Sequence, residues 1–407
     1  MHFPLKLIGK WLAVCAGVGV FASALVMASL WVEHDQPLEL PSPTGSFSVG
    51  RTSAVWVDSQ RTDPFAPSVG QKRELVVWLW YPARSVDSTT PAPYLPRPWA
   101  NALADHAGFL LTQFLNRNPE RIRTHSFVDP DLAPDQQTYP VILLRSGIGA
   151  LALDYTTLAE DLASHGYIVV GADAPYSTSV VVLPDGRVIH KTTAGNPADA
   201  SIPVAEQERL LGQLLGVWTA DTKFMVDRLE QLNAADPSGK FTGRLDLAAL
   251  GVAGHSFGGA TAAQFCHNDA RCRAGIDIDG APYGSVINYG LKQPFLFLLS
   301  DHGVDWNSPD CQICANIRSI ASRIPGDRLI VTLRGSNHFS FSDQSIVKSQ
   351  IVINLLVTTG IAGMDGPTGL ADTRQYIRTF FDIHLRGAPR GTFYQAPLMP
   401  AARLEIK

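Results

Sequence analysis

The sequence predicts an α/β fold, with a mostly parallel central sheet, helices on both of its faces and antiparallel N-terminal strands at its edge. Short apolar runs of strand length alternate with helix-like stretches, which is typical of βαβ units. The first two runs, residues 48–57 and 75–80, follow each other without a helix, so we expect antiparallel edge strands there. With 407 residues, 45% of them hydrophobic, the chain can bury one large core.

The remaining elements follow in chain order. Later strands are expected at residues 141–144, 167–171, 247–253, 274–278, 294–299 and 329–333. Helices are expected at residues 156–164, 204–232, 259–266, 316–323 and 347–357. The sequence contains no internal repeat and no low-complexity tract, so residues 47–407 are taken as one domain.

Two segments interrupt this alternation. Apolar side chains recur at helical spacing from Trp99 to Leu115, which predicts an amphipathic helix that either packs on the core or meets lipid. Residues 180–190 predict a hairpin that turns at Asp185 and Gly186. Because ligands bind beyond the carboxyl ends of parallel strands, both segments are expected to border that edge of the sheet.

The N-terminus indicates export. Lys6 and Lys10 precede an uncharged apolar stretch over residues 11–32, which is followed by a proline-containing segment. The stretch is longer than the roughly 7 to 15 apolar residues of a cleaved signal and close to the roughly 20 that span a bilayer. We expect residues 1–35 to be a signal peptide or a membrane anchor and residues 36–46 to be a linker. The domain would then lie on the periplasmic or extracellular face, anchored or secreted.

Cysteine usage agrees with export. Cys15 lies in the apolar leader, and the other four cysteines form two close pairs, Cys266 with Cys272 and Cys311 with Cys314. An even number of cysteines outside the cytoplasm predicts disulfides. A zinc site built from all four cysteines, or a redox CxxC motif at the second pair, are the alternatives.

Charge and motifs restrict the partners. The chain has 33 basic and 37 acidic residues without a marked run of either, which argues against nucleic acid or a polybasic membrane contact. It has no HExxH motif, no paired metal-ligand spacing and no GxGxxG motif after a strand, so neither a metal nor a nucleotide cofactor is predicted. A small molecule is the expected ligand.

The clearest chemical motif is a GxSxG sequence centred on Ser256. An apolar strand ends just before it, and a helix rich in small residues begins just after it. Gly254 and Gly258 remove side chains that would clash where the chain reverses, which leaves the serine exposed on a strained turn. This arrangement is typical of the α/β-hydrolase fold, so we predict that Ser256 is a nucleophile rather than part of a plain glycine-rich turn.

A serine nucleophile needs a histidine base and an acid that orients it, in the chain order Ser, acid, His. His338 is the best-placed base, because it follows the last strong strand by a short glycine-containing loop. Four acids lie between the two residues: Asp277, Asp279, Asp301 and Asp305. Asp279 and Asp301 each end a strand, and the residues alone favour Asp301 slightly, because many enzymes of this fold use the later strand.

Four stretches resemble the platelet-activating factor acetylhydrolase family, in its plasma and type II branch. They are VILLRSGIGALALDYTTLAEDLASHGYIVVGADAPYSTS, GVAGHSFGGATAAQFC, CRAGIDIDGAPYG and TLRGSNHFSFSD. Their order and spacing match that family from about residue 47 to residue 385. In the family the acid stands 23 residues after the serine, so the resemblance implies Asp279 as the acid and leaves Asp301 as the alternative.

The resemblance also implies an oxyanion hole made of the backbone N–H groups of Phe257 and Ile148. Each such donor is typically worth about 10² to 10³ in rate. The chain departs from the family just before this loop, where the usual histidine is replaced and Arg145 and Ser146 precede Gly147.

The implied reaction is the hydrolysis of short or oxidised sn-2 acyl chains from phospholipids, as in a 1-alkyl-2-acetylglycerophosphocholine esterase. It would use a Ser-His-Asp triad and an acyl-enzyme, without calcium or another cofactor. The first alternative is a broad carboxylesterase that acts on short acyl esters or polyesters. The second is a non-catalytic lipid-binding protein that keeps the hydrolase scaffold. Membrane association is expected through the N-terminal anchor and the helix from Trp99 to Leu115.

Overall fold

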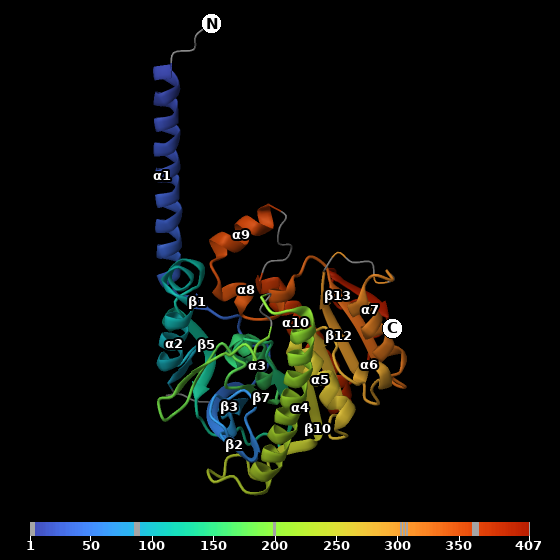
Figure 1. The fold of residues 1–407 in the computed structure, drawn as a ribbon. Helices are drawn as coiled ribbons and strands as arrows, with labels where there is room; N and C mark the ends of the chain where they lie inside the picture. Colours follow the sequence, from blue (N-terminus) through green and yellow to red (C-terminus); the bar gives the residue numbers. More distant parts are fainter. Residues whose placement is uncertain are drawn as a thin grey trace.

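A 12-stranded sheet organises the part of the chain that the structure describes (Figure 1). The computed structural model describes residues 5–84, 90–197, 201–301, 303, 306, 308–359 and 366–406. Asp305, one of the four candidate acids, lies outside these residues. The sheet strands are β1 (Leu38–Glu39), β2 (Ser48–Thr62), β3 (Lys72–Ala83), β4 (Pro91–Pro93), β5 (Ile122–Val128), β6 (Tyr139–Arg145), β7 (Ile168–Asp173), β10 (Leu245–His255), β11 (Ala274–Ile278), β12 (Phe295–Ser300), β13 (Arg328–Leu333) and β14 (Ala402–Ile406).

The strand order is β1-β5-β2-β3-β7-β6-β10-β11-β12-β13-β14, and β4 pairs with β5. The strands from β7 to β13 are parallel to one another. This confirms the predicted α/β fold with a mostly parallel sheet. Each predicted strand is present, and the predicted hairpin forms from β8 (Val180–Val182) and β9 (Val188–His190).

Helices cover both faces of the parallel strands. The α-helices of the described residues are α1 (Leu5–Asp35), α2 (Arg97–Ala107), α3 (Thr156–Ser164), α4 (Val204–Ala234), α5 (Phe257–Asn268), α6 (Val286–Tyr289), α7 (Gln312–Ser322), α8 (Gln344–Val347), α9 (Gln350–Thr358) and α10 (Gly366–Arg386). Along β6, Ile142 and Leu144 pack in the core with α3 and α10, whereas Val141 and Leu143 pack in the core with α4, α5 and α7. Side chains of a strand alternate between its faces, so one apolar run supplies both cores.

The N-terminal strands pair as expected, but the sheet continues beyond them. β2 is antiparallel to β3, and β3 is antiparallel to β7. β5 lies outside β2 and runs parallel to it, and β1 lies outside β5. Buried and more exposed side chains alternate along β5, so it has no continuous apolar run. A search for such runs therefore misses this strand.

The amphipathic segment from Trp99 to Leu115 is divided in two. α2 ends at Gly108, where a positive φ of 80° turns the chain, and a π-helix, η1 (Leu111–Leu115), follows. Trp99 is buried and packs edge-on against Trp78, with ring centroids 5.7 Å apart. Beyond the break, exposed apolar side chains gather: Phe109, Leu110, Leu111 and Leu115. The first half of the segment therefore belongs to the core, and the second half presents apolar surface.

α1 projects away from the domain (Figure 1), and its part from Cys15 to Asp35 is long and apolar enough to cross a membrane. The segment expected as a linker, residues 36–46, lies on the domain. β1, which is part of this segment, pairs with β5, and the backbone N–H of Thr44 donates a hydrogen bond of 2.9 Å to Asp161 of α3.

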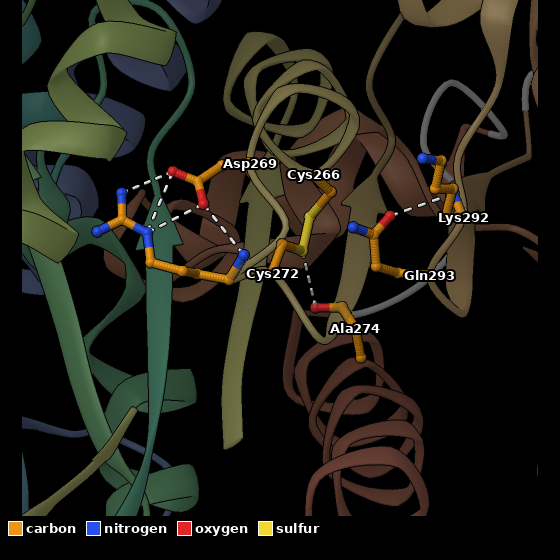
Figure 2. Close-up of a disulfide and its surroundings, with 7 residues drawn as sticks. Cys266, Asp269, Cys272, Ala274, Lys292 and Gln293 are labelled. Carbon is orange, nitrogen blue, oxygen red and sulfur yellow. Dashed lines mark hydrogen bonds and ion pairs between the residues drawn. A yellow bond between two sulfur atoms is a disulfide. The ribbon is translucent and has the colours of Figure 1, made fainter. Parts of the chain in front are cut away.

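Two disulfides are formed, as the even number of cysteines predicted, and each joins two cysteines close in sequence. Cys266–Cys272 joins the end of α5 to the turn before β11, as Figure 2 shows. Cys311–Cys314 closes the first turn of α7. Each sulfur is bonded to its neighbour, so these four residues offer no thiolates to zinc. Two disulfides and an apolar N-terminal helix are features of exported proteins.

Candidate active site

Ser256 stands on a strained turn between β10 and α5. Its φ of 56° and ψ of −126° lie outside the regions that L-residues usually adopt. Such a conformation costs about 1 to 3 kcal/mol and persists only where the surrounding structure enforces it. The serine precedes the first residue of α5, so it is held at the positive end of that helix.

Two glycines of the motif permit this turn. A Cβ atom at position 254 would lie 2.1 Å from the carbonyl oxygen of Gly258. A Cβ atom at position 258 would lie 2.5 Å from the carbonyl oxygens of Arg145 and Ser146. Backbone therefore approaches backbone at both sites, and no side chain fits. The same closeness brings the start of α5 against the loop that follows β6.

His338 and Asp279 meet at the same edge of the sheet. His338 Nδ1 lies 2.7 Å from Asp279 Oδ2. Asp279 is buried with a φ of 52°, and its carboxylate also accepts hydrogen bonds from the backbone N–H and the hydroxyl of Ser300. The side chain of His338 is 39% exposed. Ser256, Asp279 and His338 together line one cavity of about 450 Å³, so the structure brings the three predicted residues to one place.

Asp301, the alternative acid, contacts backbone instead. Its carboxylate accepts hydrogen bonds from the N–H groups of Gly335 and Gly303, at 3.0 and 3.2 Å. It lines the same cavity but has no described hydrogen bond or ion pair with the ring of His338. Its position fits a role in shaping the loop that carries the base.

The loop after β6 forms a tight turn. The N–H of Ala150 donates to the carbonyl of Gly147, and Gly149 has a φ of +78°. A positive φ at the third position is the signature of a type II turn, which favours glycine there. Within the described residues, the N–H groups of Ile148 and Phe257 have no protein acceptor. Both predicted oxyanion donors are therefore free to bind a ligand oxygen.

Arg145, where the chain departs from the family, is almost fully buried. Its guanidinium lies over the ring of Trp218 on α4, 5.0 Å from the centroid, and its Nη1 is 3.6 Å from Met225 Sδ. Burial lowers the pKa of Arg145 to about 10. Its side chain thus packs against α4.

Sequence reasoning missed a polar connection through His255. Its Nε2 lies 2.8 Å from the carbonyl oxygen of His338, and its Nδ1 lies 2.8 Å from the hydroxyl of Tyr155. That hydroxyl accepts a hydrogen bond from the N–H of Gly147, at 3.3 Å. His255, which precedes the nucleophile, thereby connects the backbone of His338 with the oxyanion turn through Tyr155. No local pattern signals it, because Tyr155 and His255 are 100 positions apart.

The tautomer of His255 follows from its partners. A carbonyl oxygen can only accept, so Nε2 of His255 must carry the proton that bonds His338. The pKa of His255 is lowered to about 3, mainly by burial and secondly by repulsion from a charged His338. The ring is therefore neutral near pH 7, and its Nδ1 accepts the hydrogen bond of the Tyr155 hydroxyl.

Two other histidines that follow Ser256 in the sequence, His267 and His384, contact other parts of the fold. His267 bonds the carbonyl of Gly290, at 2.8 Å, and His384 bonds the hydroxyl of Tyr394, at 2.6 Å. Burial lowers the pKa of His384 to about 4. Both residues act in packing between elements. His302 lies outside the described residues.

Comparisons with known proteins agree with this geometry. The sequence matches the family described as platelet-activating factor acetylhydrolase, isoform II, over residues 33–177 and 206–370. It is 26% identical over 374 residues to the platelet-activating factor acetylhydrolase of Canis lupus familiaris, covering 81% of this chain and 76% of that one. It is 27% identical over 297 residues to a probable 1-alkyl-2-acetylglycerophosphocholine esterase of Arthroderma benhamiae, with coverage of 68% and 69%.

A solved structure is also similar. A ferulic acid esterase from Streptomyces cinnamoneus superposes with a TM-score of 0.71 and 27% identity, over 90% of this chain and 99% of that one. The family match spans well over half of the chain, and the relatives in sequence and structure are esterases. The chain belongs to the platelet-activating factor acetylhydrolase isoform II family and is a carboxylic ester hydrolase with the α/β-hydrolase fold.

Proposed function

We propose that this esterase works through Ser256, His338 and Asp279, with the backbone N–H groups of Ile148 and Phe257 as its oxyanion hole. One observation carries the proposal. The strained serine lines the same cavity as a histidine whose Nδ1 lies 2.7 Å from a buried carboxylate. This is the set of groups that an unaided hydroxyl needs to become a nucleophile at neutral pH.

The reaction proceeds in two balanced halves. The Ser256 oxygen bonds the ester carbonyl carbon while Nε2 of His338 takes the hydroxyl proton, and Asp279 stabilises the imidazolium through Nδ1–H. The N–H groups of Ile148 and Phe257 bind the carbonyl oxygen as it becomes negative. His338 then gives its proton to the leaving alcohol, and the acyl-enzyme forms. Water repeats the sequence with His338 as base, which releases the acid and restores Ser256.

The substrate that we propose is a phospholipid with a short or oxidised sn-2 acyl chain. Two relatives carry names of that activity, and the cavity at Ser256 holds about 450 Å³. A broad carboxylesterase is the alternative, and the similarity to a ferulic acid esterase favours it. The two differ in the alcohol that they release, a lysophospholipid or a simple alcohol.

We also propose that α1 is a retained anchor that crosses the membrane and holds the domain on its periplasmic or extracellular face. Glu33, in its last turn, accepts a hydrogen bond of 2.7 Å from the N–H of Gln350 and another from the hydroxyl of Ser349, just before α9. The ring of Trp31 lies 6.2 Å from Phe109 and 5.8 Å from Phe114, centroid to centroid. These contacts hold α1 against the domain rather than on a free tether.

The docked anchor supports membrane association of the domain itself. Beside the end of α1, exposed apolar side chains project from η1 and its preceding loop and from α9: Phe109, Leu110, Leu111, Leu115, Ile351 and Leu355. Apolar side chains on a short surface helix bind at the level of the lipid headgroups. The domain would thus rest on the bilayer that α1 crosses.

The test combines a variant with a covalent probe. Ser256→Ala is expected to lower kcat by about 10⁴ to 10⁶ for every ester hydrolysed and to abolish labelling by a fluorophosphonate. A purified Ser256→Ala protein that keeps more than a tenth of wild-type activity contradicts the nucleophile. Wild-type protein that binds lipid but neither reacts with the probe nor turns over esters would instead be a lipid-binding scaffold.

A substrate panel separates the two esterases. Rates on phospholipid vesicles with sn-2 acyl chains of increasing length are compared with rates on soluble p-nitrophenyl esters of the same acids. A kcat/KM at least 10-fold higher for the phospholipid series supports the phospholipase activity. Equal or higher values for the phenyl esters support the broad carboxylesterase.

A further inference from the structure

A second cavity, of about 490 Å³, lies against the oxyanion turn. Ile148 and Gly149 of that turn line it, and so does Phe339, the residue after His338. The first cavity is lined instead by residues of β12, β13 and α7. The two cavities share no lining residue, and an ester carbonyl bound by the N–H of Ile148 and attacked by Ser256 would lie between them, with one substituent of the ester in each.

The second cavity lies on the membrane side of the domain. His34 of α1 lines it, together with residues of α2 and η1. Figure 1 shows α1 and α2 at one end of the sheet and α7 with β13 at the other end. In a phospholipid the headgroup and the sn-1 chain both belong to the leaving alcohol, and they stay with the bilayer. The membrane-side cavity is therefore the one for the alcohol, and the first cavity is the one for the acyl group.

Lys348 places a positive charge in the membrane-side cavity. It is partly buried, and its Nζ lies over the ring of Phe339, 5.3 Å from the centroid. Among the described residues, no carboxylate lies within ion-pair distance of this ammonium group. Removing a charge from water without a partner is unfavourable, and an anionic ligand would offset this cost.

The other charged groups of this cavity are already engaged. The carboxylate of Asp154 accepts hydrogen bonds from the N–H of Leu151 and the side chain of Gln344, and burial raises its pKa. Arg117 forms an ion pair with Glu33, and Glu120 forms one with Arg97. The imidazole of His34 forms a hydrogen bond with the carbonyl of Asn116. The charge of Lys348 opposes part of that rise in the pKa of Asp154, but among the described residues the Lys348 ammonium group has no ion pair and no hydrogen bond.

We propose that Lys348 binds the phosphate of a glycerophospholipid whose leaving alcohol occupies this cavity; the proposal rests on the esterase mechanism above. Lysine binds phosphate as a compact point charge. Phe339 shields that charge from water on one side, because the ammonium lies over its ring. Lys348 therefore selects the alcohol part of the substrate and takes no part in bond making at Ser256.

The experiment compares esters with and without a phosphate. Wild type, Lys348→Met and Lys348→Arg are assayed on a short-chain 2-acetyl phosphatidylcholine kept below its micelle concentration, on the matching acetyl glycerol without a headgroup, and on p-nitrophenyl acetate. Monomeric substrate keeps vesicle charge out of the comparison. We expect Lys348→Met to lower kcat/KM about 10- to 100-fold on the phospholipid and less than 2-fold on the other two esters. Lys348→Arg should retain most activity on all three.

Two controls make the outcome decisive. Lys223→Met removes an exposed lysine of α4 that pairs with Asp227, and it should change none of the three rates. Ser256→Ala should abolish all three. A phospholipid rate that Lys348→Met leaves unchanged, or a loss shared equally by the three esters at unchanged thermal stability, overturns the phosphate site. Activity that survives in Ser256→Ala overturns the mechanism beneath it.

Discussion

His255 offers the sharpest test of how the site is held together. In His255→Phe, a ring of similar shape replaces the imidazole and removes both nitrogens. The carbonyl of His338 then loses its donor, and the hydroxyl of Tyr155 loses its acceptor. Each buried polar group without a partner costs about 1 to 3 kcal/mol. The free energy of unfolding should therefore fall by about 2 to 6 kcal/mol.

The effect on catalysis follows from where the lost bonds lie. His338 begins a short 3-10 helix, η4 (His338–Phe341), and its backbone carbonyl is held to β10 by the bond from His255. A displacement of about 1 Å at a reacting group can cost about 10²-fold in rate. We expect kcat to fall about 30- to 100-fold, with KM changed less than 3-fold, because His255 contacts the base and not the substrate.

The assay is steady-state ester hydrolysis beside thermal unfolding, with two further variants. His255→Gln keeps one donor and one acceptor, so it should recover at least a third of the lost kcat. Tyr139→Phe is the matched control, because it removes a buried hydroxyl that bonds the carbonyl of Ala133 at 3.0 Å, away from the site. It should lower stability and leave kcat unchanged. If His255→Phe keeps wild-type kcat, or Tyr139→Phe loses as much, the connection does not position the base.

Three more outcomes are expected. Asp279→Asn should lower kcat about 10³- to 10⁴-fold, because an amide can hold His338 in the wrong tautomer. Asp301→Asn should lower kcat less than 10-fold. The opposite ranking would make Asp301 the acid of the triad in place of Asp279. Burial raises the pKa of Asp277 to about 8, so the folded protein keeps a proton that the unfolded chain loses above about pH 4, and stability falls as the pH rises towards 8. Asp277→Asn should therefore destabilise less at pH 8 than at pH 5 in denaturant titrations, and an equal loss at both values would show that Asp277 ionises normally. Replacing Cys266 and Cys272 by alanine should lower the free energy of unfolding by about 2 kcal/mol in denaturant titrations, and unchanged stability would mean that the disulfide restrains nothing.

Local patterns were sufficient for the frame of the fold. Apolar runs of strand length and helical periodicity predicted the strands β2 to β13 except β4 and β5, because each parallel strand is buried on both faces and must be apolar throughout. They failed at β5, where one face is more exposed and the apolar run is broken. The same patterns predicted one continuous helix where the structure has α2 and η1. Helical spacing of apolar residues continues across Gly108, although its positive φ turns the chain.

In the candidate site, too, some residues are predicted by their near neighbours in sequence and others are not. GxSxG between a strand and a helix predicts Ser256 from near neighbours, because Gly254 avoids the carbonyl oxygen of Gly258, whereas Gly258 avoids the carbonyls of Arg145 and Ser146 on a loop distant in sequence. The residues left Asp279 and Asp301 open, and only the resemblance chose between them. Their difference lies in tertiary contacts, since one carboxylate lies 2.7 Å from Nδ1 of His338 and the other accepts the N–H of Gly335.

The sequence by itself determined the class of fold, the turn at Ser256 and the position of His338 after the last parallel strand. Tertiary structure alone decided the contacts of Tyr155 with His255, the docking of α1 on η1, and the two cavities, one lined by Ser256 and the other by the oxyanion turn. The reason is physical. Backbone propensity and steric exclusion act between near neighbours, whereas hydrogen bonds and cavities form between side chains that strand order and register bring together from distant positions.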